Sequence, residues 1–260
     1  GTANVALGDT ALDDGSLSGA GNTAIGASAL SANTSGASNT AVGCGALLSN
    51  TTGTPNTAVG RQSMQSNTTG TCNTAVGAGS LQSNTTGCEN TAMGQQALTT
   101  NTTGEFNTAF GRGVLLCNET GDANTGVGRY ALFENTTASN NTAVGYHSLI
   151  CNTTGGSNTA TGYQALQNNT TGASNTGLGV CALRDNTTAS NNTAVGLCSL
   201  KANTTGTTNT ALGSSALRDN TTGDRNIGIG SNAIRNGTTA CCNIAIGVSA
   251  MQNASTGNDN

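Results

Sequence analysis

Asparagine side chains that could carry sugars recur along this chain at one fixed spacing. Twelve of them begin the motif N-x-S/T without a proline, the acceptor motif for N-linked glycans, and in the last two repeats the motif begins one residue earlier. If these side chains point outward, glycans would line one edge of the molecule; the alternative is that N-T-T-G only forms a favourable turn. The candidate acceptors are Asn33, Asn50, Asn67, Asn84, Asn101, Asn118, Asn135, Asn152, Asn169, Asn186, Asn203, Asn220, Asn236 and Asn253. Asn140, Asn168 and Asn191 begin further motifs, and the threonine hydroxyls are alternative O-linked acceptors.

Cysteines are the second group with chemistry, and there are nine of them, so at least one thiol is free or bonded to another chain. Cys181 and Cys198 share one position of consecutive repeats, which predicts Cα atoms about 4.8 Å apart, within reach of a disulfide. Cys72 and Cys88 lie at neighbouring positions of adjacent repeats and form a second candidate pair. The alternative is that cysteine merely replaces alanine or serine as a small residue. We expect no metal site, because the chain has one histidine and no C-x-x-C motif.

Charged and aromatic side chains also fall into columns. A basic column at position ten of four successive repeats would suit an acidic ligand or a subunit contact, or else forms a solvated edge with local ion pairs; it consists of Arg184, Lys201, Arg218 and Arg235. Aromatic side chains gather near positions six and seven, where they would bind sugars or cover a surface; they are Tyr130, Tyr146, His147 and Tyr163. One histidine without a positioned partner supports no catalytic triad, so the sequence predicts no enzyme, no catalytic residue and no cofactor.

A 17-residue unit, N-T-A-V-G-x-x-A-L-x-x-N-T-T-G-x-x, positions all of these side chains. It occurs fourteen times without a slip, and each unit opens on an asparagine, from Asn22 to Asn243. A short fixed period indicates a solenoid, in which each repeat is one coil that contacts its neighbours. We therefore expect a single repeat domain over residues 1–260, with an irregular first coil at 1–21 and regular repeats at 22–260.

Within one unit the residue types predict an all-β coil. Apolar residues recur at positions four and nine, and position five is glycine in all fourteen units, which indicates a positive φ or a site without room for Cβ. We predict two short strands per coil, around T-A-V-G and x-A-L-x, and a left-handed corner at the glycine of N-T-T-G. The fold class is then a parallel β-solenoid, or β-roll, of about fifteen coils.

Two large apolar residues in each unit make a thin core. Either asparagine and threonine ladders fill the remaining interior, or apolar columns meet those of other chains. The second possibility predicts a homo-oligomer, most simply a trimer. Net charge is −4, which gives no general attraction to nucleic acid or to an anionic membrane. No apolar run approaches the roughly 18 residues that a membrane-spanning segment needs.

The unit N-T-A-V-G-x-x-A-L resembles the head repeats of trimeric autotransporter adhesins, although this chain's repeat is longer. It is also similar to the N-T-A-V-G-Y-Q-A-L repeats of phage tail-fibre-like surface proteins, and the run from Gly162 to Leu166 matches that form directly. The resemblance covers residues 4–260. It implies a left-handed parallel β-roll, exposure outside the cell or on a virion, and a structural or adhesive role.

Three functions compete at this point. The leading interpretation is a structural subunit of an extracellular, glycosylated fibre that assembles with copies of itself end to end. The alternative is an adhesin or tail-fibre shaft that binds a receptor, as a homotrimer. A more remote alternative is an ice-binding solenoid, which would need T-x-T strands rather than the T-T pairs of the turns.

Overall fold

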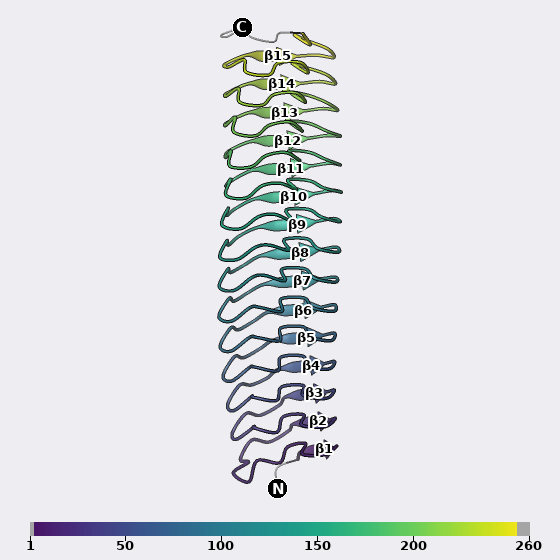
Figure 1. Ribbon diagram of the computed structural model, residues 1–260, viewed down its shortest axis with the longest axis vertical. Coiled ribbons are helices and arrows are strands. Elements are labelled where there is room, and N and C mark those ends of the chain that lie inside the picture. The colour runs from purple at the N-terminus through teal and green to yellow at the C-terminus, as the bar shows by residue number, and fades with distance from the viewer. Residues whose placement is uncertain (1–2, 254–260) are drawn as a thin grey trace. The chain divides into compact units, whose positions relative to one another are not determined.

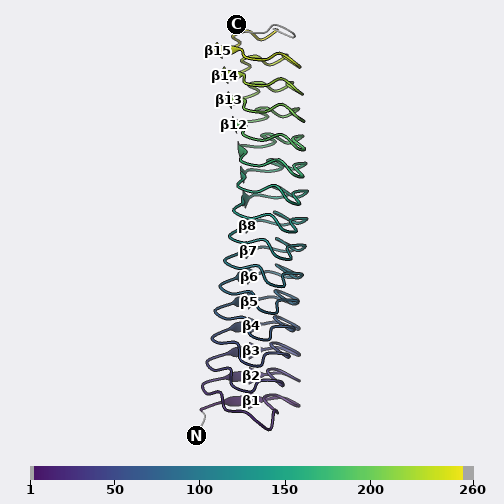
Figure 2. The same ribbon diagram turned by 90° about the vertical axis from the view of Figure 1, so that its left-hand side faces the viewer.

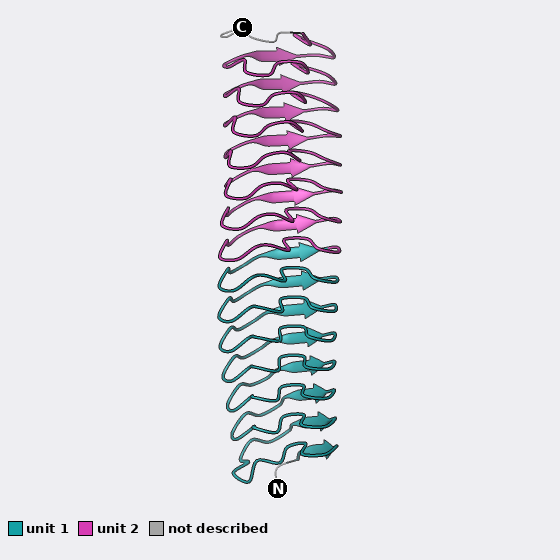
Figure 3. Ribbon diagram, in the orientation of Figure 1, with its two compact units in different colours: residues 1–127 teal, residues 128–260 magenta. Residues whose placement is uncertain are grey.

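The computed structural model describes residues 3–253 and contains strands and turns but no helix in that range. The chain divides into two compact units, residues 1–127 and 128–260, which Figure 3 colours teal and magenta. Each unit is a parallel β-solenoid whose coils carry one three-residue strand each. The first unit contains β1 (Val5–Leu7), β2 (Thr23–Ile25), β3 (Thr40–Val42), β4 (Thr57–Val59), β5 (Thr74–Val76), β6 (Thr91–Met93), β7 (Thr108–Phe110) and β8 (Thr125–Val127). The second contains β9 (Thr142–Val144), β10 (Thr159–Thr161), β11 (Thr176–Leu178), β12 (Thr193–Val195), β13 (Thr210–Leu212), β14 (Ile227–Ile229) and β15 (Ile244–Ile246).

Neighbouring strands within a unit pair in parallel and keep one register. Thr57 pairs with Thr74 and Val59 with Val76, so equivalent positions of the repeat stack on one another. The pair β1–β2 departs from this period, because Val5 lies opposite Thr23, one residue further along than the period requires. The offset lies next to the first coil, residues 1–21, which the sequence predicted to be irregular. Figures 1 and 2 show, within each unit, the strands following one another along one side of the coils.

The second predicted strand, around x-A-L-x, is wrong. Leu47 has a φ of 49° and Gly45 before it a φ of 66°, both in the left-handed region that strands do not use. The amide of Ala46 donates to the carbonyl of Gly43 at 3.2 Å, which closes a tight turn. The leucine side chain is nevertheless fully buried. The sequence therefore identified a core residue correctly and its backbone conformation incorrectly.

The two repeated glycines have different roles. At position five the prediction is confirmed: Gly60 has a φ of 137°, and a Cβ there would lie 2.6 Å from the carbonyl carbon of Gly77 in the next coil. The predicted left-handed corner at position fifteen is wrong, because the positive φ occurs at position seventeen instead, as at Cys72 with 58°. At position fifteen the constraint is space, since a Cβ on Gly70 would lie 2.4 Å from the Oδ1 atom of Asn67.

The interior of each coil is narrow and partly polar. Successive strand residues point to opposite faces, so the alanine of T-A-V faces inward, where it is buried, while the threonine and valine face outward. The leucine of position nine and the alanine before it complete the apolar part of the core. Asparagines at positions one and twelve fill the rest, which confirms the predicted asparagine ladders.

Candidate functional site

The twelve asparagines of position twelve lie inside the coils. All are buried, with exposed fractions of at most 1%. In a typical coil the Nδ2 atom of Asn84 donates to Oδ1 of Asn67 at 2.8 Å and to the carbonyl of Gly87 at 3.0 Å. Both amide hydrogens are thus in use, and a sugar on Nδ2 would replace one of them and require space that the interior lacks. The condition for a glycosylated edge, an outward-pointing acceptor, is not met at these positions.

A second ladder runs through the asparagines of position one. Nδ2 of Asn39 donates to the carbonyl of Gly53 at 2.9 Å, and its backbone amide donates to Oδ1 of Asn22 in the preceding coil, also at 2.9 Å. The Gly53 carbonyl also accepts from Asn50 at 3.2 Å. Each turn carbonyl therefore joins both ladders, which explains why buried amides persist in every regular coil.

The position-twelve ladder ends at Asn220. In the next coil the motif shifts by one residue, so Gly237 occupies the place that an asparagine would fill. Oδ1 of Asn220 is buried and has no hydrogen-bond partner. The shifted asparagine, Asn236, is exposed instead and donates to Oδ1 of Asn253 at 2.7 Å.

Exposed N-x-S/T asparagines are therefore few. Asn236 and Asn253 are the exposed members of the predicted set, and Asn140 and Asn191 of the additional motifs are exposed at position seventeen. Asn168 is half-buried and donates to Oδ1 of Asp185 at 3.2 Å. Whether any of them carries a glycan stays a prediction.

The two threonines of N-T-T-G have different environments. At position thirteen the hydroxyl of Thr85 donates to the carbonyl of Thr102 in the next coil at 3.0 Å, and the same bond recurs from coil to coil within each unit. At position fourteen the hydroxyl of Thr86 is exposed. One threonine thus stabilises the stack of coils while the next one faces solvent.

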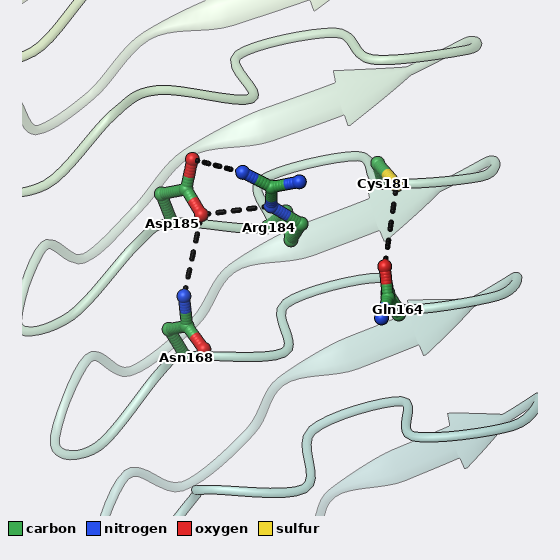
Figure 4. Close-up of polar contacts among 5 residues, drawn as sticks. All are labelled: Gln164, Asn168, Cys181, Arg184 and Asp185. Atoms are coloured by element: carbon green, nitrogen blue, oxygen red, sulfur yellow. Dashed lines mark hydrogen bonds and ion pairs between the residues drawn. The ribbon is translucent and has the colours of Figure 1, made fainter.

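All nine cysteines are free thiols in the structure, so the predicted pairs Cys181–Cys198 and Cys72–Cys88 are not bonded in it. Sγ of Cys181 lies 3.8 Å from Oε1 of Gln164 in the neighbouring coil, as Figure 4 shows. Burial raises the pKa of the Cys181 thiol, and the nearby Cys198 raises it further. A raised pKa lowers the fraction of reactive thiolate.

The basic column is partly neutralised by its own neighbours. The Arg184 guanidinium donates to both carboxylate oxygens of Asp185, at 2.8 and 2.9 Å, and Arg218 binds Asp219 in the same way (Figure 4 for the first pair). These bonds raise the pKa of both arginines. Among residues 3–253 no ion pair within 4 Å involves Lys201 or Arg235. The arrangement agrees with the expected edge of local ion pairs.

An aromatic cluster occupies variable positions of the repeat in the second unit. The rings of Tyr146 and His147 stack with centroids 3.8 Å apart, and Tyr146 is also nearly parallel to Tyr163, at 5.8 Å. Tyr130 lies 5.8 Å from His147 and meets Phe133 edge to face at 5.2 Å. The predicted aromatic residues do therefore come together, and Phe133 joins them.

A small cavity lies beside this cluster. Its volume is about 230 Å³, and it is lined by Tyr130, Phe133, His147 and Ile150. Burial and the Arg129 cation lower the pKa of His147, so the imidazole is neutral at pH 7. The cavity walls are then uncharged and apolar. Phe133 and Ile150 were missed from sequence, although both occupy position ten, which the coil places beside position seven.

The outward sheet face, formed by positions two and four, is the largest departure from the expected core. Position four was predicted to be one of two apolar columns, which form a thin core or meet the columns of another chain; in the structure Phe110 is 48% exposed and Val76 37%. Threonine or isoleucine flanks it at position two, and no residue of either position carries a charge in any coil. Alternation along a short strand explains the outcome, because a buried alanine at position three requires positions two and four to face outward.

Residues 3–253 hold no cluster of three or more His, Cys, Asp or Glu side chains that could bind a metal ion. The same residues include no helix with the length and apolar character of a membrane span. No protein-family model matches the chain, and no curated protein matches it.

Proposed function

We propose that this chain is a structural segment of an extracellular, glycosylated fibre and that it associates with further copies of itself, laterally or end to end. No catalytic step belongs to this role. A solenoid of similar coils suits it, since length and surface grow with each repeat.

The outward sheet face is the observation that carries the proposal. Solvent-facing positions elsewhere in the coil vary widely: position six includes Arg61, Gln95, Tyr146 and Ser214. Positions two and four stay uncharged throughout, and position four is apolar in nearly every coil although it is exposed or half-exposed. An uncharged and largely apolar strip on a protein surface is typical of an interaction site.

Cryo-electron microscopy of the native assembly tests the fibre directly. We expect filaments in which the outward sheet face is covered by another copy. Single solenoids in solution with this face open to water, at concentrations up to the millimolar range, would contradict the proposal. Thermal hysteresis of such single particles would instead favour the ice-binding alternative, which the same uncharged face would serve.

A second candidate function is receptor binding by an adhesin or tail-fibre segment, and the aromatic cluster favours it. Tyr146 and Tyr163 are 38% and 48% exposed and stack on each other, and Tyr146 also stacks on His147, which lines the apolar cavity. Exposed aromatic rings near an apolar cavity are common in ligand sites. Cell binding by the isolated protein, lost in Tyr163→Ala and kept in the control Val76→Ala, would support it. Equal binding by both variants would exclude the aromatic cluster as the receptor site.

A further inference from the structure

The exposed hydroxyls of position fourteen form a column whose persistence the fold does not explain. Every one of these residues is exposed, and none of their hydroxyls makes a hydrogen bond within the described part of the chain. They are Ser35, Thr52, Thr69, Thr86, Thr103, Thr120, Thr137, Thr154, Thr171, Thr188, Thr205, Thr222 and Thr239.

Position thirteen, directly before this column, loses its hydroxyl in one coil, whereas position fourteen does not. Position thirteen has a structural hydroxyl, yet one coil replaces it with Glu119 and keeps its backbone contact, since the Glu119 carbonyl accepts from Thr102 at 3.0 Å. Position fourteen has no such bond to lose, and still no coil lacks the hydroxyl. Ser35 preserves the hydroxyl without the β-branch, so the oxygen, rather than a conformational preference, is the shared feature.

The N-linked motif does not account for these hydroxyls either. Position fourteen supplies the Ser/Thr of each motif that begins at position twelve, but the asparagine of such a motif is buried in the ladder, where both of its amide hydrogens are bonded. In the folded coil the asparagine cannot be modified, so N-linked glycosylation does not require the hydroxyl at position fourteen. The exposed oxygen is itself a nucleophile that can carry a substituent.

We propose that position fourteen is a column of O-linked glycosylation sites. This inference rests on the glycosylated fibre proposed above and moves the sugar from the buried asparagine to the exposed hydroxyl two residues later. In the transfer, Oγ bonds to the anomeric carbon of a nucleotide-activated sugar, the bond from that carbon to phosphate breaks, and the hydroxyl proton passes to a base of the transferase. The nucleoside diphosphate leaves with the electron pair. Because adjacent acceptors lie about 4.8 Å apart, we expect small sugars on a subset of coils.

Site mapping by electron-transfer mass spectrometry of the natively produced protein tests the assignment. We expect hexose-type mass increments on position-fourteen residues, and none on positions twelve and thirteen. Unmodified position-fourteen hydroxyls in native material, or sugars on the position-twelve asparagines of folded protein, would overturn it. Electron microscopy of the same sample separates the two proposals: bare hydroxyls in a surface fibre would refute only the modification, and modified protein without a fibre would refute only the fibre.

Two variants in one turn separate the loss of an acceptor hydroxyl from a disturbance of the local structure. Thr171→Val removes a position-fourteen acceptor, and we expect its peptide to lose the sugar while the unfolding midpoint stays unchanged. Thr170→Val is the matched control, because it removes the cross-coil hydrogen bond to Thr187 and leaves the acceptor in place. A sugar kept on this peptide in Thr171→Val and lost in Thr170→Val would place the modification at position thirteen and contradict the assignment.

Discussion

The buried column at position nine and the outward sheet face at position four are both apolar in sequence, but they differ in their exposure to solvent. Position nine is leucine or another large apolar residue and is fully buried; position four is nearly as apolar and is substantially exposed. The position-twelve asparagine, the more polar residue, is buried where the position-four valine is not. Strict repetition thus marks a position as constrained without telling whether the constraint is packing, a hydrogen-bonded ladder or a surface that something else covers.

The largest expected effect comes from removing one apolar side chain at position nine and, for comparison, one at position four, both in the first unit. Leu98→Ala should lower the free energy of unfolding by about 2–5 kcal/mol, because it leaves a cavity in a core with few other large side chains. Val76→Ala at the outward face should cost less than about 1 kcal/mol. Denaturant unfolding measures both, and equal losses would show that the sheet face is already covered in solution.

Breaking the asparagine ladder should have the next largest effect. Asn101→Ala removes two hydrogen bonds that Asn101 donates and the one it accepts from Asn118, leaving buried polar atoms unpaired. We expect a loss on the order of 2–3 kcal/mol, visible as a lower unfolding midpoint. Thr103→Ala, on the exposed side of the same turn, is the control and should be close to neutral. A neutral Asn101→Ala would mean that the ladder fills space without stabilising the coil.

Substitutions of the two threonines of one turn should differ less in stability than the pairs above. Thr85→Val replaces the hydroxyl that donates to Thr102 and should cost about 1 kcal/mol. Thr86→Val should leave stability unchanged, because that hydroxyl is exposed. Thermal unfolding of the two variants compares them, and a reversed order would place the structural hydroxyl at position fourteen instead.

Acidification should lower the free energy of unfolding through His147 of the aromatic cluster, and we expect this effect to be smaller still. The pKa of His147 lies below its ordinary value of 6.5 in the folded state, so the unfolded chain binds more protons as the pH falls. His147 therefore leaves stability unaffected above pH 6.5 and lowers it as the pH falls from 6.5 towards the folded-state pKa. His147→Gln should flatten this part of the stability profile, as measured by unfolding at a series of pH values; an unchanged slope would assign it to other groups.

Much of the architecture followed from the sequence alone. The 17-residue period, the all-β character of residues 3–253, the glycine of position five and the buried leucine column were predicted correctly, because period and residue type determine which side chains stack. The gathering of Tyr130, Tyr146, His147 and Tyr163 was also predictable, since register alone places neighbouring positions of adjacent coils together.

Only the tertiary structure decided which way each column faces. Residue types favoured a second strand at x-A-L-x and an outward asparagine at position twelve, but a left-handed turn at Leu47 and its equivalents directs the chain so that leucine and asparagine both point inward. Whether a polar amide can be buried depends on partners that only the neighbouring coils supply, here another asparagine and a turn carbonyl. The difference between Thr85 and Thr86 has the same origin, because identical adjacent residues acquire different roles only when the next coil offers a carbonyl to one of them.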